Sequence, residues 1–93
     1  MKIEHKNSHS KGVFLAKVDD RIIGEMTYVW TDDNCFIIDH TEVNPEYQGK
    51  NVGQEMVKNT VDFARENNFT IIPLCPFVAK VFERNPDYQD VKK

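Results

Sequence analysis

Apolar and polar residues alternate along much of the first half of the chain, which is the pattern of strands that bury one face. Three long runs show this pattern and are rich in β-branched and aromatic residues: residues 13–18, residues 21–30 and Cys35–Val43. A shorter run, residues 3–6, predicts a first strand, and Gly24 marks a candidate bulge. The connections are too short for parallel crossovers, so we expect an antiparallel meander.

The pattern changes to a helical period after residue 51. Apolar or small residues are spaced for one helix face, and charged or amide residues occupy the opposite face. The predicted buried face consists of Val52, Met56, Val57, Thr60, Val61 and Ala64. Asn67 and Asn68 end this helix, because asparagine accepts the left-handed backbone that often follows a helix.

A second strand and helix are predicted after this point. Residues 69–74 form a strand that returns beside Cys35–Val43, which makes a parallel crossover unit. Pro73 lacks an N–H, so it weakens this strand or breaks its ladder locally. Pro76 begins a helix over Pro76–Arg84. The order β-β-β-β-α-β-α predicts an α+β domain with a mixed, mostly antiparallel sheet.

Length and composition bound the function. Ninety-three residues allow one domain, residues 1–93, in which we expect residues 87–93 to form a loose tail. The net charge of −3 argues against general nucleic-acid binding. No apolar run has the length of a signal peptide or a membrane span, so we expect a cytoplasmic protein without a membrane partner. Cys35 and Cys75 match no metal spacing; we expect no metal and two free thiols.

Residues 43–53, between the third long strand and the first helix, carry the most chemical information. The first turn of a helix leaves N–H groups unpaired and carries partial positive charge, so a strand, a tight turn and a helix start predict an anion site. Side-chain charges cancel between Glu46 and Lys58, so main-chain N–H groups must do most of the holding. The spacing is neither that of a P-loop nor that of a dinucleotide fingerprint.

Residues 48–53 resemble the pyrophosphate loop of the GCN5-related N-acetyltransferases, whose pattern is Gln/Arg-x-x-Gly-x-Gly/Ala. The chain fills this pattern with Gln48, Gly49, Lys50, Asn51, Val52 and Gly53. Asn51 departs from the usual glycine. Asparagine is the non-glycine residue that best tolerates left-handed backbone angles, so the loop geometry can survive.

The predicted order of elements extends the resemblance over nearly the whole chain. It is similar to the central half of the family fold, without the two N-terminal helices that help to form the acceptor site and without the C-terminal strand pair. This truncated layout resembles the short, YjdJ-type branch of the family. The shared cues are residues 40–43, residues 47–53, residues 73–78 with Phe82, and residues 84–86.

The resemblance implies an N-acetyltransferase that takes an acetyl group from acetyl-CoA, as a substrate, and passes it to an amine. Val43 and the loop would hold pantetheine and pyrophosphate, with Thr41 and Val43 adding main-chain hydrogen bonds. Lys50 is the expected phosphate neighbour. Lys80 and Arg84, one helical turn apart, could also contact phosphates or simply be solvated. A protein lysine, a polyamine and a small metabolite all remain open as acceptors.

Cys75 is the first catalytic candidate. It immediately precedes Pro76 and so lies at a helix start, a position that favours the reactive thiolate. In the short branch the matching cysteine is the proposed catalytic residue. The plain alternative is a buried small hydrophobe. Cys35 lacks this context, and we expect it to pack within its strand.

His40 is the second catalytic candidate. On an alternating strand His40 and Glu42 share one face, and Asp39 and Thr41 share the other. A neutral imidazole could accept the proton released when an amine attacks a thioester, or it could orient Cys75. A strand histidine bonded to its neighbouring strand is an equal alternative. The other two histidines, including His5, are expected at the surface.

Two other classes of function remain open. A non-catalytic acyl-CoA-binding or interaction module fits the missing acceptor-side helices. A plain structural domain would leave Gly49 and Gly53 as turn and packing residues. Ligand binding separates the structural domain from the other two, and acetyl turnover separates an enzyme from a binding module.

Overall fold

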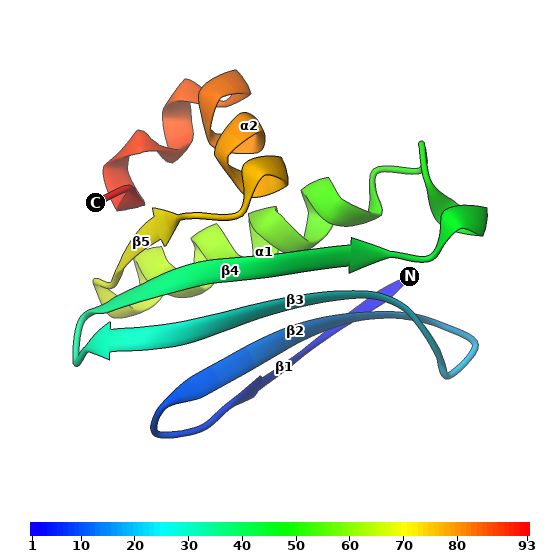
Figure 1. Cartoon of the computed structure of the whole chain (residues 1–93), viewed down its shortest axis with the longest axis horizontal. Helices are drawn as coiled ribbons and strands as arrows, with labels where there is room; N and C mark the ends of the chain where they lie inside the picture. Colours follow the sequence, from blue (N-terminus) through cyan, green and yellow to red (C-terminus); the bar gives the residue numbers. More distant parts are fainter.

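The computed structural model describes all 93 residues and has the predicted order of elements (Figure 1). The strands are β1 (Lys2–Asn7), β2 (Lys11–Val18), β3 (Arg21–Asp32), β4 (Cys35–Val43) and β5 (Thr70–Pro73). The helices are α1 (Val52–Asn67) and α2 (Pro76–Arg84), with short 3-10 helices η1 (Pro45–Tyr47) and η2 (Pro86–Val91). The predicted α+β fold is therefore confirmed.

The five strands form one sheet in the order β1-β2-β3-β4-β5. β1 to β4 are antiparallel neighbours joined by short turns, and β5 runs parallel to β4 after the crossover through α1. β4 and α2 have the predicted bounds. β1, β2 and β3 each extend beyond the predicted runs, whereas β5 is shorter because it ends at Pro73.

One face of the sheet carries the hydrophobic core, and both helices pack on it. The strands contribute Phe14, Ala16, Ile23, Met26, Tyr28, Phe36, Ile38 and Ile71, and the helices contribute Val52, Met56, Val57, Val61, Ala64, Val78, Val81 and Phe82. The apolar face predicted for α1 is thus buried. We call the opposite face, which carries Val13, Leu15, Thr27, Val29 and Ile37, the open face.

The ladders of β3 contain three register shifts, and two of them bear on the faces of the sheet near the site. Ala16 pairs with Gly24 and Lys17 pairs with Ile22, so Ile23 is the extra residue, next to the predicted bulge position. In β4 the extra residue is Asp39. Its Oδ1 accepts a hydrogen bond from the Thr27 hydroxyl at 2.7 Å, on the open face. The prediction that Asp39 and Thr41 share a face is therefore wrong. Because Asp39 is an extra residue in β4, the alternation restarts after it, and Thr41 lies on the face opposite to Asp39.

The last residues are packed, unlike the loose tail that the sequence predicted. Arg65 of α1 holds the Asp90 carboxylate through Nε at 2.8 Å, and this hydrogen bond lowers the pKa of Asp90. Val91 is buried, and the N–H of Lys93 donates to Ile71. Tyr88 and Val91 are separated by polar residues and give little sequence signal, so the prediction of a loose tail is wrong.

His5, also expected at the surface, packs against the aromatic part of the core. Its ring stacks on Phe14 with centroids 4.0 Å apart and meets the edge of Phe63 at 4.5 Å. Its Nε2 lies 2.6 Å from the Tyr28 hydroxyl, which itself donates to Asn7. Nε2 therefore carries a hydrogen and donates it. Burial lowers the pKa of His5 and raises the pKa of Tyr28 to about 12.

Gly12 makes room for Tyr28 at this point. A Cβ on Gly12 would lie 2.2 Å from Cζ of the Tyr28 ring, a distance that no side chain can adopt. Trp30 Nε1 also donates to Asn7 at 2.9 Å. These side-chain hydrogen bonds of His5 and Asn7 hold β1 on the sheet in addition to the main-chain bonds of its ladder.

We expect the free energy of unfolding to decrease as the pH falls below about 6.5, the ordinary pKa of histidine, because unfolded His5 then takes up a proton more readily than folded His5. The contribution is fully present above that pH. His5→Phe keeps the stacking but does not titrate, so its stability should depend less on pH between about 5 and 7. Urea unfolding at several pH values measures this.

His9→Gln is the matched control, and it should keep the pH dependence of the parent protein. Equal pH dependence in His5→Phe and the parent protein would contradict the assignment.

Candidate functional site

The candidate site begins where β5 leaves β4. The parallel ladder joins residues 35–38 to residues 70–73, and the N–H of Cys75 then donates to the Ile38 carbonyl at 3.0 Å. Beyond this bond no strand pairs with the outer edge of β4. Pro73 has no N–H to extend the ladder, and the chain turns into α2 at Pro76. Residues 39–43 therefore keep one edge free.

Thr41 and Val43 direct their main-chain groups into this opening. The N–H of Asn44 points toward β3, because it donates to Ile23 at 2.8 Å. Main-chain groups of successive residues alternate between the two edges of a strand, so those of Thr41 and Val43 point away from β3. An edge of this kind can pair with an extended ligand as if with another strand.

The loop after β4 brings the start of α1 opposite this edge. Gly49 and Asn51 both have left-handed backbones, with φ of 81° and 63°. Asn51 therefore adopts the left-handed backbone that asparagine was expected to tolerate at this position. α1 begins without a side-chain cap, and the N–H groups of residues 52–54 have no main-chain acceptor. These N–H groups and the positive end of the helix dipole form a surface suited to an anion.

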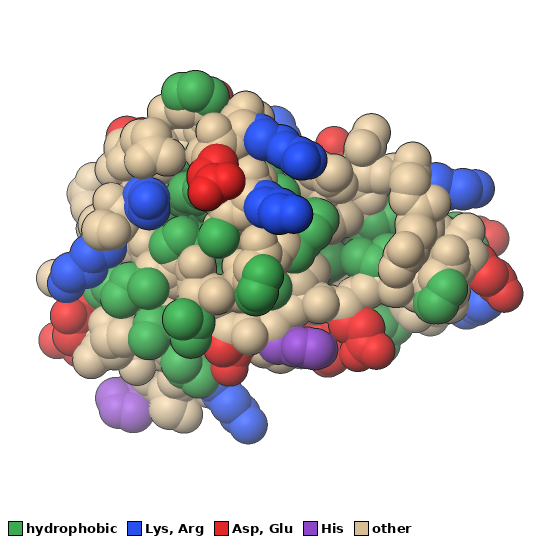
Figure 2. All heavy atoms as spheres, turned by 45° about the horizontal axis from the view of Figure 1, so that its top comes forward, with side chains coloured by type: hydrophobic (Ala, Val, Ile, Leu, Met, Phe, Trp, Pro, Cys, Tyr) green, Lys and Arg blue, Asp and Glu red, His purple; other side chains and the backbone are tan.

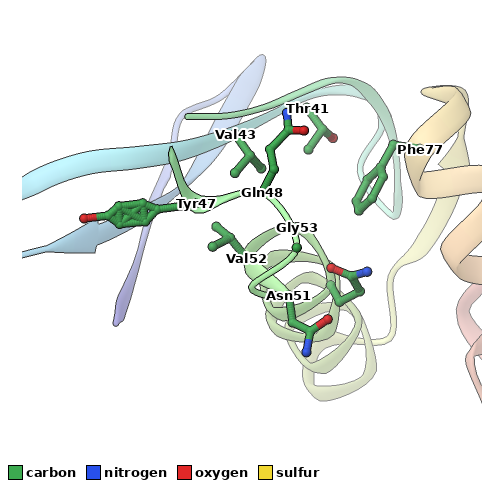
Figure 3. Close-up of a pocket in the computed structure, with 10 residues that line it drawn as sticks. Thr41, Val43, Tyr47, Gln48, Asn51, Val52, Gly53 and Phe77 are labelled. Carbon is green, nitrogen blue, oxygen red and sulfur yellow. The ribbon is translucent and has the colours of Figure 1, made fainter. Parts of the chain in front are cut away.

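A cavity of about 300 Å³ lies between the β4 edge and the first turn of α1 (Figure 3). It is lined by Thr41, Val43, Tyr47, Gln48, Gly49, Asn51, Val52, Gly53, Gln54 and Phe77. Figure 3 shows the Gln48 side chain reaching toward Thr41, while Phe77 faces the cavity from α2. The structure thus brings together all the predicted cofactor-binding residues except Lys50, Lys80 and Arg84.

Phe77 is the main lining residue that sequence reasoning missed. A Cβ on Gly53 would lie 2.5 Å from Cζ of the Phe77 ring, so glycine at this position lets the ring rest on the first turn of α1. Phe77 is partly exposed. Its place directly after Cys75-Pro76, at the start of a helix facing the loop, is the signal that could have identified it.

Cys75 lies at the N-terminus of α2 and borders the cavity through Thr41. It is the N-cap residue, is 7% exposed, and its thiol donates to Thr41 Oγ1 at 3.6 Å. Thr41 in turn lines the cavity. Cys35 is buried at the other end of β4, and both cysteines are free. The two cysteines therefore have the different surroundings that the sequence indicated.

His40 lies on the open face, away from the cavity lining. It pairs with Thr27 across the β3–β4 ladder, and its Nε2 lies 3.6 Å from Glu42 Oε2. The imidazole is 57% exposed. His40 and Glu42 share a face, as predicted from alternation. No hydrogen bond joins His40 to Cys75, whose thiol lies on the side of β4 that faces the cavity.

The three basic candidates lie outside the cavity lining. The Lys50 ammonium is 5.7 Å from the centroid of the Tyr47 ring, a cation–π distance. Lys80 and Arg84 are exposed on α2. The space-filling view shows basic side chains grouped over α2 around one acidic side chain (Figure 2). None of the three is among the residues that line the cavity.

No helix is long and apolar enough to cross a bilayer. No group of three or more His, Cys, Asp or Glu side chains is placed to hold a metal ion.

The family model of the GCN5-related N-acetyl-transferases matches residues 13–91. The solution structure of a GCN5-like N-acetyltransferase candidate from Staphylococcus aureus is similar to this chain at 37% identity and a TM-score of 0.73. That alignment covers 97% of this chain and 87% of the other. No curated protein sequence matches the chain.

Two larger enzymes share the fold at lower identity. A GNAT family acetyltransferase from Elizabethkingia anophelis, solved with acetyl-CoA bound, is 22% identical with a TM-score of 0.60, over 67% of this chain and 41% of the other. An aminoglycoside acetyltransferase from a soil metagenomic sample, in complex with sisomicin, is 21% identical with a TM-score of 0.65, over 94% of this chain and 59% of the other. These chains are clearly longer than the present one.

The cavity between the free edge of β4 and the start of α1 lies within the matched residues, and the Staphylococcus aureus structure shares nearly the whole length of the chain. The chain therefore belongs to the GCN5-related N-acetyltransferase family.

Proposed function

We propose that this protein transfers an acetyl group from acetyl-CoA to a primary amine. The observation that carries the proposal is the cavity in which a free strand edge faces an uncapped helix N-terminus. The free strand edge suits an extended arm that contains amide groups, and the helix N-terminus suits a pyrophosphate. The acetyl-CoA complex of the Elizabethkingia anophelis enzyme, which shares this fold, supports the choice of cofactor.

In this proposal the pantetheine arm pairs with Thr41 and Val43 along the β4 edge. The pyrophosphate lies against the N–H groups of Val52 and Gly53 and of Gln54, with Gln48, Gly49 and Asn51 shaping the loop around it. Lys50, Lys80 and Arg84 would contact the nucleotide phosphates from outside the cavity. Because they do not line the cavity, we assign them a smaller share of the affinity.

The thioester would then lie near the point where β4 and β5 separate, between Cys75 on one side and His40 on the other. The amine attacks the thioester carbonyl from the open face, and His40 accepts the proton that the amine loses. The C–S bond of the tetrahedral intermediate then breaks, and CoA leaves as a thiolate. The Cys75 thiol, hydrogen-bonded to Thr41, would lie beside the departing sulfur and give it a proton.

Direct transfer is the route we favour over an acetyl-cysteine intermediate. A cysteine nucleophile needs an adjacent base to take its proton, and the only hydrogen-bond partner of the Cys75 thiol is the Thr41 hydroxyl.

The acceptor is an amine that we do not identify further, because the sisomicin complex belongs to a relative and not to this chain. A binding module without turnover is the alternative, and the exposed position of His40 is the observation that favours it. We propose a cytoplasmic location, in keeping with two unpaired cysteines.

Acetyl-CoA should shift the amide NMR signals of Val52, Gly53 and Gln54 more than those of any other helical residue. Gly53→Ala should weaken binding by about tenfold, or about 1.4 kcal/mol, because the added Cβ both narrows the approach to the pyrophosphate and displaces Phe77. Gly53→Ala combined with Phe77→Leu separates the two causes, since the smaller side chain removes the clash. Unmoved loop signals at saturating acetyl-CoA would contradict the binding site.

Cys75→Ala should lower the rate of acetyl transfer at least tenfold and leave the acetyl-CoA-induced loop shifts intact, because binding and chemistry use different residues. Cys35→Ala is the matched control and should transfer acetyl at the parental rate if it folds. Intact-protein mass spectrometry during turnover should show no acetyl group on Cys75 if transfer is direct. Full activity in Cys75→Ala would leave this thiol with a packing role only.

His40→Ala should lower kcat/KM for acetyl transfer at least tenfold and leave the acetyl-CoA-induced loop shifts intact, because the group that accepts the amine proton is lost. Steady-state kinetics check this, with His9→Ala as the control that should keep the parental rate. A parental kcat/KM in His40→Ala would show that His40 does not act as the base.

A further inference from the structure

The open face of the sheet is covered by no element of the chain. Both helices pack on the opposite face, with Phe14, Met26 and Phe36. The middle of the open face is nonetheless apolar: Leu15 is buried, Val13 and Ile37 are half-buried, and Val29 is 37% exposed. Three strands, β2, β3 and β4, thus carry an aliphatic stripe that neither helix covers.

The charges on this face divide into two halves. The β1–β2 half carries Lys2, Lys6, Lys11 and Lys17 with Glu4, a net charge of +3. The β3–β4 half carries Glu25, Asp39 and Glu42, a net charge of −3 with neutral His40. The two halves are equal and opposite, so the face is complementary to itself.

Several of these charges lack partners within the chain. Glu4 pairs with Lys17 at 3.1 Å and with Lys2 at 3.8 Å, whereas Lys6 and Lys11 have no ion pair. On the acidic half Glu25 and Glu42 are direct cross-strand neighbours, an arrangement that destabilises a sheet unless a cation is near. Each half therefore presents the charge that the other lacks.

Charged side chains that have no ion pair face each other across a hollow on the open face. It measures about 410 Å³ and lies between Lys6 and Lys11 on one side and Glu25 and Asp39 on the other. Val13, Thr27 and Val29 also line it. An occupant of this surface must offer apolar groups in the centre, carboxylates toward β1 and β2, and cations toward β3 and β4.

We propose that the occupant is the same face of a second copy of this chain. A two-fold axis parallel to the strands, between β2 and β3, would set the lysine half of each copy over the acidic half of the other. Two sheets would then pack face to face about 10 Å apart, with the valine and leucine side chains between them. An axis across the strands would oppose like charges.

Other partners satisfy only half of the surface. A nucleic acid or an acidic peptide would pair with the lysines and be repelled by Glu25, Asp39 and Glu42. This arrangement also leaves β5 and the cavity at the rim of the interface, so cofactor binding can proceed in the dimer. Four strands present roughly 400 Å² per partner, about half of what stable complexes bury, so the dimer is weak and salt-sensitive.

Sedimentation velocity over micromolar to millimolar protein concentrations tests this, with charge-reversed pairs of variants. Lys6→Glu/Lys11→Glu gives both halves of the face a net negative charge, and Glu25→Lys/Asp39→Lys gives both halves a net positive charge, so each variant alone should be monomeric. An equimolar mixture should form a heterodimer. Glu55→Lys/Lys58→Glu, on the exposed side of α1, is the matched control and should dimerise like the parent protein. Circular dichroism confirms that each variant is folded.

A monomeric parent protein at millimolar concentration would overturn the proposal and leave the face to another protein. So would folded variants that remain monomeric when mixed, or that still self-associate alone. Carbodiimide crosslinking of mixed isotope-labelled and unlabelled parent protein gives a test without variants. It should join Lys6 or Lys11 of one copy to Glu25 or Asp39 of the other, and crosslinks confined to other faces would contradict the arrangement.

Discussion

The free outer edge of β4 is the constraint on which the site depends. β5 pairs with β4 over four residues and then leaves, because Pro73 cannot extend the ladder and Pro76 starts α2. The opening that results is bounded by main-chain groups of Thr41 and Val43 and by the N–H groups at the start of α1. Affinity built from main-chain groups needs a fixed backbone more than particular side chains, which is consistent with a loop in which asparagine replaces a glycine.

The sequence predicted the order of elements and the loop because both follow from local rules. Apolar periodicity located β4 and α1, and the left-handed tolerance of Asn51 was used as expected. The features it missed depend on contacts distant in the chain. No local signature marks the bulge at Asp39 that moves His40 to the open face, the packing of His5 on Phe14 and Phe63, or the Arg65–Asp90 pair that holds the tail. Phe77 joined the site through its contact with Gly53, which only the packing of α2 reveals.

The bulge in β4 also separates the two catalytic candidates. Thr41 and the Cys75 thiol lie on the cavity side of the strand, and His40 lies on the open face. A thioester held between them would meet a proton acceptor on one side and a proton donor on the other. The face that carries His40 is also the face proposed for the contact between copies, so the approach of an acceptor and the weak dimer would compete for it.

The proposed function requires that a CoA arm complete the sheet along β4. Amide hydrogen exchange, read residue by residue with and without acetyl-CoA, measures this directly. We expect slower exchange at Thr41 and Val43, which gain acceptors on the free edge, together with Val52, Gly53 and Gln54, while the Ser8–Lys11 turn is unchanged. Unchanged exchange at Thr41 and Val43, in a protein saturated with acetyl-CoA, would contradict it.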